Sequence, residues 1–106
     1  MPGTGFRHTG DMGKLTTDEV VGRLGELPGW TREGDSIVRQ FVFDGFASAV
    51  AFVVRIGFEA EAADHHPDIL ISNYKKVTVT FTTHSEKGLT EKDFAAAAAA
   101  DRVFVS

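Results

Sequence analysis

The spacing of hydrophobic residues changes period several times along this chain, and these changes constrain the fold more than any other feature. Two segments alternate as strands do, and each consists of two short arms joined by a turn. The first covers Trp30–Phe43 with its turn at Glu33–Asp35, and the second covers Ile69–Thr83 with its turn at Asn73–Lys75. Arms this close together in the chain pair as antiparallel hairpins.

Helical patterns precede, separate and follow the two hairpins. They are expected over residues 15–27, 46–64 and 90–103. Thr16 and Thr90 are the expected N-caps of the first and last helix, each with an acidic residue three positions later. The order α-β-β-α-β-β-α predicts an α+β fold, in which a four-stranded antiparallel sheet carries its helices on one face.

The central helix is unusually apolar. Its predicted apolar surface consists of Phe46, Ala49, Val50, Val53, Val54, Gly57 and Phe58, extended by Phe52 and Ile56. A helix with so broad an apolar surface is normally covered on more than one side. Since a chain this short has little else to cover it, we expect a second copy of the chain, in a homodimer or homotetramer.

Length and composition limit the possible functions. The 106 residues suffice for one domain, expected over residues 15–106, after a glycine-rich flexible leader at residues 1–14. The leader lacks the apolar segment of a signal peptide, so a cytoplasmic protein is expected. A net charge of −4 argues against direct nucleic-acid binding, and no apolar run is long enough to span a membrane. The absence of cysteine excludes disulfides, a thiolate nucleophile and cysteine-ligated metals.

Three histidines lie where predicted elements end, at His65 and His66 after the long helix and at His84 after the last strand. A structural role is one interpretation, since a histidine at a helix C-terminus interacts favourably with the helix dipole, by about 0.3–1 kcal/mol. A second interpretation is a metal site, in which the histidines and Asp64 or Glu61 would be the ligands. Adjacent helical side chains point about 100° apart, however, and no HExxH-like spacing occurs, so we expect no metal.

Acid–base chemistry without a cofactor is the third interpretation. Histidine has the side-chain pKa nearest neutrality, so it can donate or accept a proton at working pH. Glu61 lies one helical turn before His65 and could orient its ring, although it could equally be a solvated carboxylate.

The spacing of several polar residues resembles the signature of a known family, the pterin-4a-carbinolamine dehydratases, which also serve as the dimerisation cofactor of a homeodomain transcription factor. The residues that carry the resemblance are Glu61, His65-His66-Pro67, Tyr74, His84 and Asp93. The likeness extends over about Leu15 to Val103 and includes Pro28-Gly29-Trp30 and the strand Arg39 to Phe43.

The resemblance implies a fold, an assembly and a reaction. Members of the family have the four-stranded sheet described above, form dimers by joining sheets and often form tetramers through the long helices. They remove water from 4a-hydroxytetrahydrobiopterin to give quinonoid dihydropterin, which serves tetrahydrobiopterin recycling. This reaction moves protons but takes no electrons from the pterin, so neither a cofactor nor a metal is expected.

The resemblance also implies roles for particular residues. His65 and His84 would act as acid and base, His66 would contact the pterin, and Glu61 completes the catalytic group. The further expected pterin contacts are Trp30, Asp64, Thr82, Thr83, Ser85 and Asp93. Trp30 could instead be a core residue. Ile69 stands where relatives often carry an aromatic residue.

A function without catalysis remains as the alternative. The chain could be a dimerisation or assembly factor that binds a protein partner through its apolar long helix. Retention of all three histidines favours the enzyme.

Overall fold

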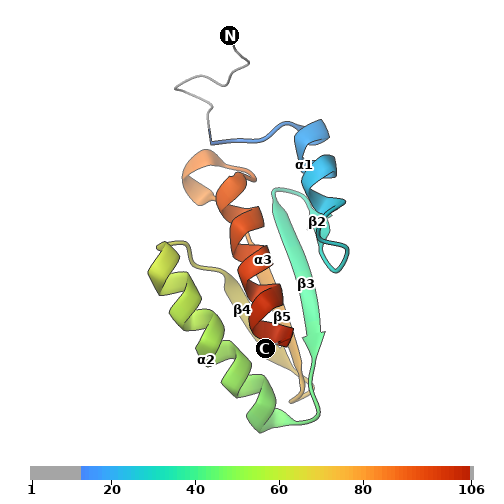
Figure 1. The fold of residues 1–106 in the computed structure, drawn as a ribbon, viewed down its shortest axis with the longest axis vertical. Coiled ribbons are helices and arrows are strands. Elements are labelled where there is room, and N and C mark those ends of the chain that lie inside the picture. Colours follow the sequence, from blue (N-terminus) through green and yellow to red (C-terminus); the bar gives the residue numbers. More distant parts are fainter. Residues whose placement is uncertain (1–12, 106) are drawn as a thin grey trace.

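The computed structural model describes residues 13–105, so residues 1–12 of the predicted leader lie outside the described part (Figure 1). The elements are α1 (Thr17–Leu24), β2 (Thr31–Glu33), β3 (Ser36–Val42), α2 (Phe46–Ala63), β4 (Asp68–Ser72), β5 (Lys76–Phe81), a 3-10 turn η1 (His84–Glu86) and α3 (Glu91–Val105). Apart from the short turn η1, this is the predicted element order.

The predicted α+β fold is confirmed. The four strands form one antiparallel sheet in the order β2-β3-β5-β4. Helices α2 and α3 lie side by side and pack on the same face of the sheet, whereas α1 lies at the end of the molecule near β2 (Figure 1). Thr83, two residues after β5, forms an isolated β-bridge with Gly88, so the segment after β5 and the start of α3 lie close together.

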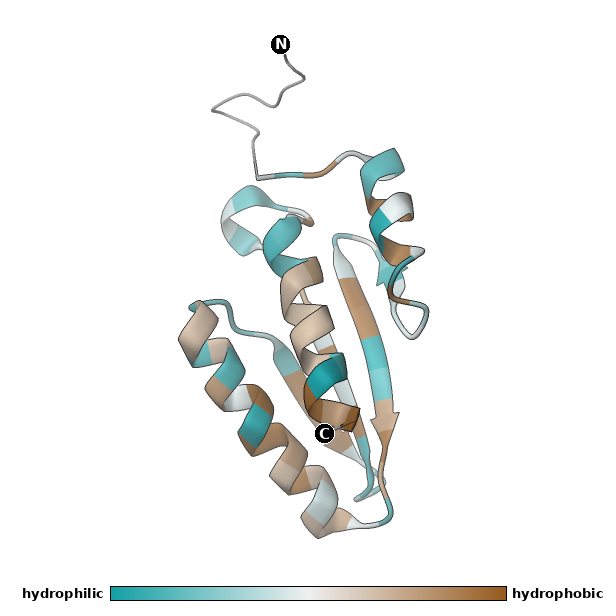
Figure 2. Ribbon diagram, viewed as in Figure 1, coloured by the Kyte–Doolittle hydropathy of each residue, from teal (hydrophilic) through white to brown (hydrophobic). Residues whose placement is uncertain are grey.

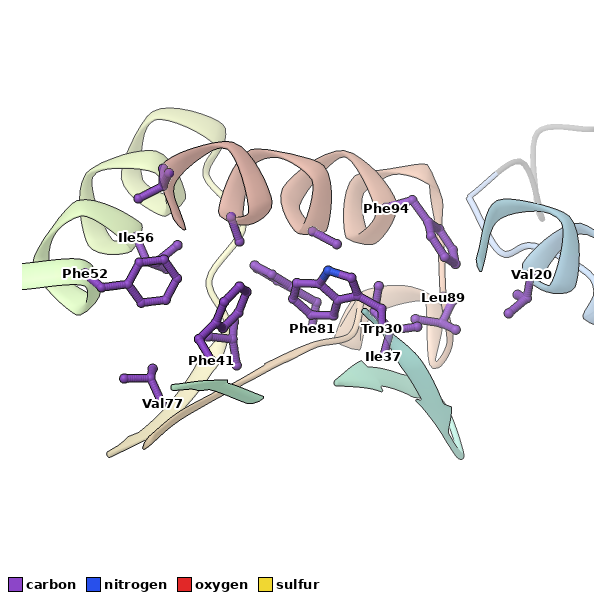
Figure 3. Packing of buried hydrophobic residues seen from close by; sticks show 14 of the residues in the cluster. Val20, Trp30, Ile37, Phe41, Phe52, Ile56, Val77, Phe81, Leu89 and Phe94 are labelled. Atoms are coloured by element: carbon purple, nitrogen blue, oxygen red, sulfur yellow. The ribbon is translucent and has the colours of Figure 1, made fainter. Parts of the chain in front are cut away.

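The core lies between the sheet and helices α2 and α3 (Figure 3). Alternate residues of β3 and β5 point into it, as their spacing predicts, and the buried members of these strands are Ile37, Phe41, Val77, Val79 and Phe81. The rings of Phe41 and Phe52 pack with their centroids 4.7 Å apart, and Trp30 lies 5.8 Å from Phe81.

Arg39 also points to the core side of β3, and two interactions accommodate its charge. The guanidinium lies 4.3 Å from the centroid of the Phe41 ring, and its Nη1 donates to Asp101 Oδ1 at 2.7 Å. The same carboxylate oxygen accepts from Trp30 Nε1 at 2.9 Å. Asp101 thereby connects α3 to the strand side of the core.

Several predicted ends differ by a few residues. Helix α1 begins after Thr16, whose capping box with Glu19 is present, but it ends at Leu24 and not near residue 27. The N–H groups of Glu26 and Leu27 donate to carbonyls three residues back, which closes turns and ends the α-helix at Gly25. The first strand starts one residue after Trp30.

The buried face of α2 is a correction to the sequence analysis. Ala49, Phe52, Ile56 and Ala60 face the core, so the two residues expected only to extend the apolar surface are central to it. Four other residues of the predicted apolar surface form a separate exposed row, namely Phe46, Val50, Val54 and Phe58. Figure 2 shows hydrophobic colour along much of α2. Within residues 13–105, no helix has both the length and the apolar character needed to cross a membrane.

Candidate functional site

The end of α2 directs two adjacent histidines apart. Asp64 adopts the left-handed conformation (φ 52°, ψ 44°), which a short polar residue tolerates. The N–H of Asp64 donates to Glu61 O and the N–H of His65 donates to Ala60 O, the hydrogen-bond pattern of a Schellman motif. The chain therefore leaves the helix axis at Asp64, and His65 turns toward α3 while His66 stays at the surface.

His65 is held by a carboxylate and by an aromatic ring. Its Nε2 lies 2.6 Å from Asp93 Oδ1, and the two side chains are only 11% and 0% exposed. The imidazole stacks on Phe81 with an interplanar angle of 11° and centroids 6.0 Å apart. Because a carboxylate only accepts hydrogen bonds, we assign the proton of neutral His65 to Nε2, which leaves Nδ1 as the basic nitrogen.

Asp93 belongs to the N-terminus of α3. Its Oδ2 accepts from the N–H of Thr90 at 2.9 Å, so Asp93 lies at the N3 position, three residues after the N-cap as the spacing predicts, while the Thr90 hydroxyl accepts from the N–H of Lys92. The same oxygen accepts from the Thr83 hydroxyl at 2.8 Å. One acidic side chain thus caps α3, accepts from the segment that follows β5 and binds His65.

Glu61 has a different partner from the one that the sequence suggests. Its Oε1 lies 2.7 Å from His66 Nε2, and both side chains are exposed, by 78% and 56%. The expectation that Glu61 orients His65 is therefore wrong: the left-handed turn at Asp64 carries His65 away, and Asp93 takes that role.

The remaining predicted residues differ in exposure, and some are exposed, one is half-buried and others are buried. His84 is exposed at the start of η1, next to Thr83, and Asp64 and Ser85 are also exposed. Thr82 is half-buried, and its hydroxyl donates to the backbone oxygen of Asp35 at 2.6 Å.

Trp30, Thr83 and Asp93 are buried. Trp30 lies in the core behind Phe81, and its indole N–H is bonded to Asp101. This is the core placement that the sequence left open. Thr83 and Asp93 are buried and bonded to each other, and Asp93 also binds His65.

Two pockets flank this network. A pocket of about 190 Å³ lies between α2 and α3 beside His65 and Phe81, and its walls are mainly alanine side chains. A second, of about 240 Å³, is lined by Thr83, Ser85 and the first residues of α3. Among residues 13–105, no three histidine or carboxylate side chains gather as ligands of a metal ion would.

Comparison with known proteins assigns the chain to a family. The sequence model of pterin 4 alpha carbinolamine dehydratase matches residues 13–103. The chain belongs to this family. A protein of Roseiflexus sp. (strain RS-1) named "Putative pterin-4-alpha-carbinolamine dehydratase" is 50% identical over 90 residues, covering 85% of this chain and 96% of the relative. A protein of the same name from Mycobacteroides abscessus is 49% identical, covering 85% and 95%.

Solved structures of dehydratase-like proteins have the same fold. The crystal structure of a transcriptional coactivator/pterin dehydratase from Brucella melitensis superposes with a TM-score of 0.81 at 36% identity, covering 85% of this chain and 97% of that one. A pterin dehydratase-like protein identified as a RuBisCO assembly factor in the alpha-carboxysome has a TM-score of 0.59 at 22% identity, covering 73% and 88%. The second likeness concerns the fold alone.

The sequence analysis of this dehydratase-family chain missed two residues that shape the site. Phe81 was expected only in the core, yet its ring also supports His65. Thr90 was expected only as an N-cap, yet its hydroxyl lies 2.8 Å from that of Thr83. The signal for Thr90 was present, because an N-cap and its N3 partner always lie close in space and Asp93 belongs to the signature.

Proposed function

We propose that this protein dehydrates 4a-hydroxytetrahydrobiopterin (pterin-4a-carbinolamine) to quinonoid dihydropterin and water by histidine acid–base catalysis, in the service of tetrahydrobiopterin recycling. Membership of the dehydratase family supports the substrate class. The observation that carries the mechanism is the pairing of His65 with the buried Asp93, because it holds one imidazole in a fixed orientation beside a pocket.

The proton balance of the reaction fits two histidines. The hydroxyl on the ring carbon leaves as water and needs a proton, and the adjacent ring nitrogen gives one up. One imidazole delivers the first proton while the other accepts the second, so no net proton or electron is consumed. His65 is suited to this exchange because its Nδ1 is the basic nitrogen.

His84 is the proposed second group. The connection along the chain supports this assignment. His84 follows Thr83, whose hydroxyl is 2.8 Å from the carboxylate that binds His65. Its exposure leaves the ring available to a bound ligand.

His66 is proposed to contact the pterin with its ring oriented by Glu61. Asp64, Thr82 and Ser85 lie in the same two segments and are the further proposed contacts. Because His66 and Glu61 are largely exposed, we expect them to affect substrate binding more than the chemical step.

The test is a stopped assay that follows quinonoid dihydropterin formation from the 4a-hydroxy adduct. Replacement of His65 or His84 by Ala is expected to lower kcat about 10²–10⁴-fold, the usual contribution of a positioned acid–base group. His8→Ala, outside the described residues, is the matched histidine control. Wild-type turnover in folded His65→Ala protein would refute the proposal.

A second candidate function rests on the exposed apolar row of α2, formed by Phe46, Val50, Val54 and Phe58. Such a row binds another protein surface, which we propose to be a second copy of the chain in a homodimer or homotetramer. A non-catalytic assembly factor would instead use the row for a foreign partner. A stable monomer in light scattering would contradict the oligomer and leave the row available to that partner.

A further inference from the structure

The two carboxylate oxygens of Asp93 have different hydrogen-bond partners. Oδ2 accepts from the Thr83 hydroxyl at 2.8 Å and from the Thr90 N–H at 2.9 Å. Oδ1 lies 2.6 Å from His65 Nε2. The side chain is completely buried, so these three protein groups take the place of water around the carboxylate.

The two threonine hydroxyls form a chain with a defined direction. Each hydroxyl has one proton to donate. Since Thr83 donates to Asp93, the 2.8 Å contact between the two hydroxyls requires Thr90 to be the donor. The Thr90 oxygen in turn accepts from the N–H of Lys92 at 3.2 Å. Every donation therefore runs toward the carboxylate.

We propose that Thr83 and Thr90 are positioning residues for His65. The torsion that rotates a carboxylate group is soft, so a single hydrogen bond would hold it poorly. Two donors on Oδ2 fix the plane of the carboxylate and present Oδ1 to His65 Nε2. This keeps the proton on Nε2 and leaves Nδ1 free for the ligand. The inference rests on the proposed function, and it assigns to Thr83 a role through Asp93 in place of the predicted substrate contact.

Burial supports this role over direct contact. Thr83 and Thr90 are 5% and 3% exposed, and each hydroxyl donates its one proton and accepts one hydrogen bond within the chain of hydrogen bonds. A substrate that accepted a hydrogen bond from either hydroxyl would break a bond that this network needs. Their effect on the reaction must therefore pass through the imidazole.

The first test measures the tautomer of His65 by ¹⁵N NMR of the full chain without substrate. We expect wild-type protein to carry the proton on Nε2, Thr83→Val to give a mixture of tautomers, and Thr83→Ser to restore the wild-type state. Thr80→Val is the matched control, because Thr80 lies on β5, three residues before Thr83, and on the opposite face of that strand from Val79 and Phe81.

The second test separates kcat from KM. Loss of one hydrogen bond to a charged group predicts that Thr83→Val lowers kcat roughly 10- to 100-fold with KM unchanged. A rise in KM at constant kcat would overturn the inference, since it indicates direct contact with substrate. An unchanged tautomer together with an unchanged kcat would also overturn it.

The outcomes distinguish this inference from the proposed function. A tautomer change in Thr83→Val, in a protein that does not dehydrate the pterin, would support the positioning role and refute the dehydratase activity. Equal dehydration rates for wild-type and Thr83→Val proteins, with the same His65 tautomer in both, would refute the positioning role and support the dehydratase activity. Should Thr83→Val fail to fold, the wild-type spectrum still decides, because a proton on Nδ1 of neutral His65 contradicts the proposal.

Discussion

Replacement of Asp93 by Asn is expected to reverse the protonation of His65 without removing a hydrogen-bonding group. The N–H of Thr90 is a backbone donor and cannot be reversed, so the amide oxygen must occupy the position of Oδ2. The amide NH2 then faces His65 Nε2, the atom that lies 2.6 Å from the carboxylate in wild-type protein. A donor at that position forces Nε2 to accept and moves the proton to Nδ1.

The consequence is a catalytic loss larger than the loss of stability. A misprotonated His65 cannot accept a proton at Nδ1, so kcat should fall about 10²–10⁴-fold. The fold loses one charge-assisted hydrogen bond, worth about 1.5–3 kcal/mol, while the shape of the side chain is kept.

Stopped turnover and urea unfolding measure the two effects, and ¹⁵N NMR identifies the tautomer. Asp101→Asn is the matched control, a carboxylate-to-amide change on the same helix whose two donors both use one oxygen that Asn retains. A folded Asp93→Asn protein with near-wild-type kcat and the proton still on Nε2 would refute the reasoning.

Three further predictions concern other parts of the molecule. Asp101→Ala should lower the free energy of unfolding by about 2–3 kcal/mol in chemical denaturation, because it leaves an indole N–H and a half-buried guanidinium without their acceptor; a change below about 0.5 kcal/mol would contradict this. Phe58→Lys should reduce the molar mass in light scattering, because it charges the exposed row of α2, whereas Ser48→Lys on another exposed face should not. Equal masses for these two variants would exclude the row as the interface. Glu61→Gln should raise KM by no more than about fivefold with kcat retained, because an exposed pair with His66 contributes about 1 kcal/mol or less; a large fall in kcat would place Glu61 in the chemical step.

Caps and strand faces were predictable because they depend on neighbouring residues. The capping box at Thr16 and the burial of Val77, Val79 and Phe81 follow from spacings of two or three positions. The buried face of α2 was not predictable in the same way. Nearly every side of that helix is apolar, so its periodicity could not show which row faces the sheet.

The pairing of the site residues shows the same limit. Glu61 lies near both His65 and His66 in the chain. It binds His66 because the left-handed conformation of Asp64 turns His65 away from it. Asp93 lies 28 positions from His65, so their contact depends on how α3 packs against the end of α2.

The amino-acid sequence by itself determined the order of the elements, the start of its capped helices, the inward faces of the strands and the residues of the family signature. The tertiary structure decided which carboxylate binds which histidine, and that Thr83 is buried with its hydroxyl on Asp93. The physical reason is that local structure is governed by interactions within a few residues, whereas the partner of a side chain is set by the docking of elements that are distant in the chain.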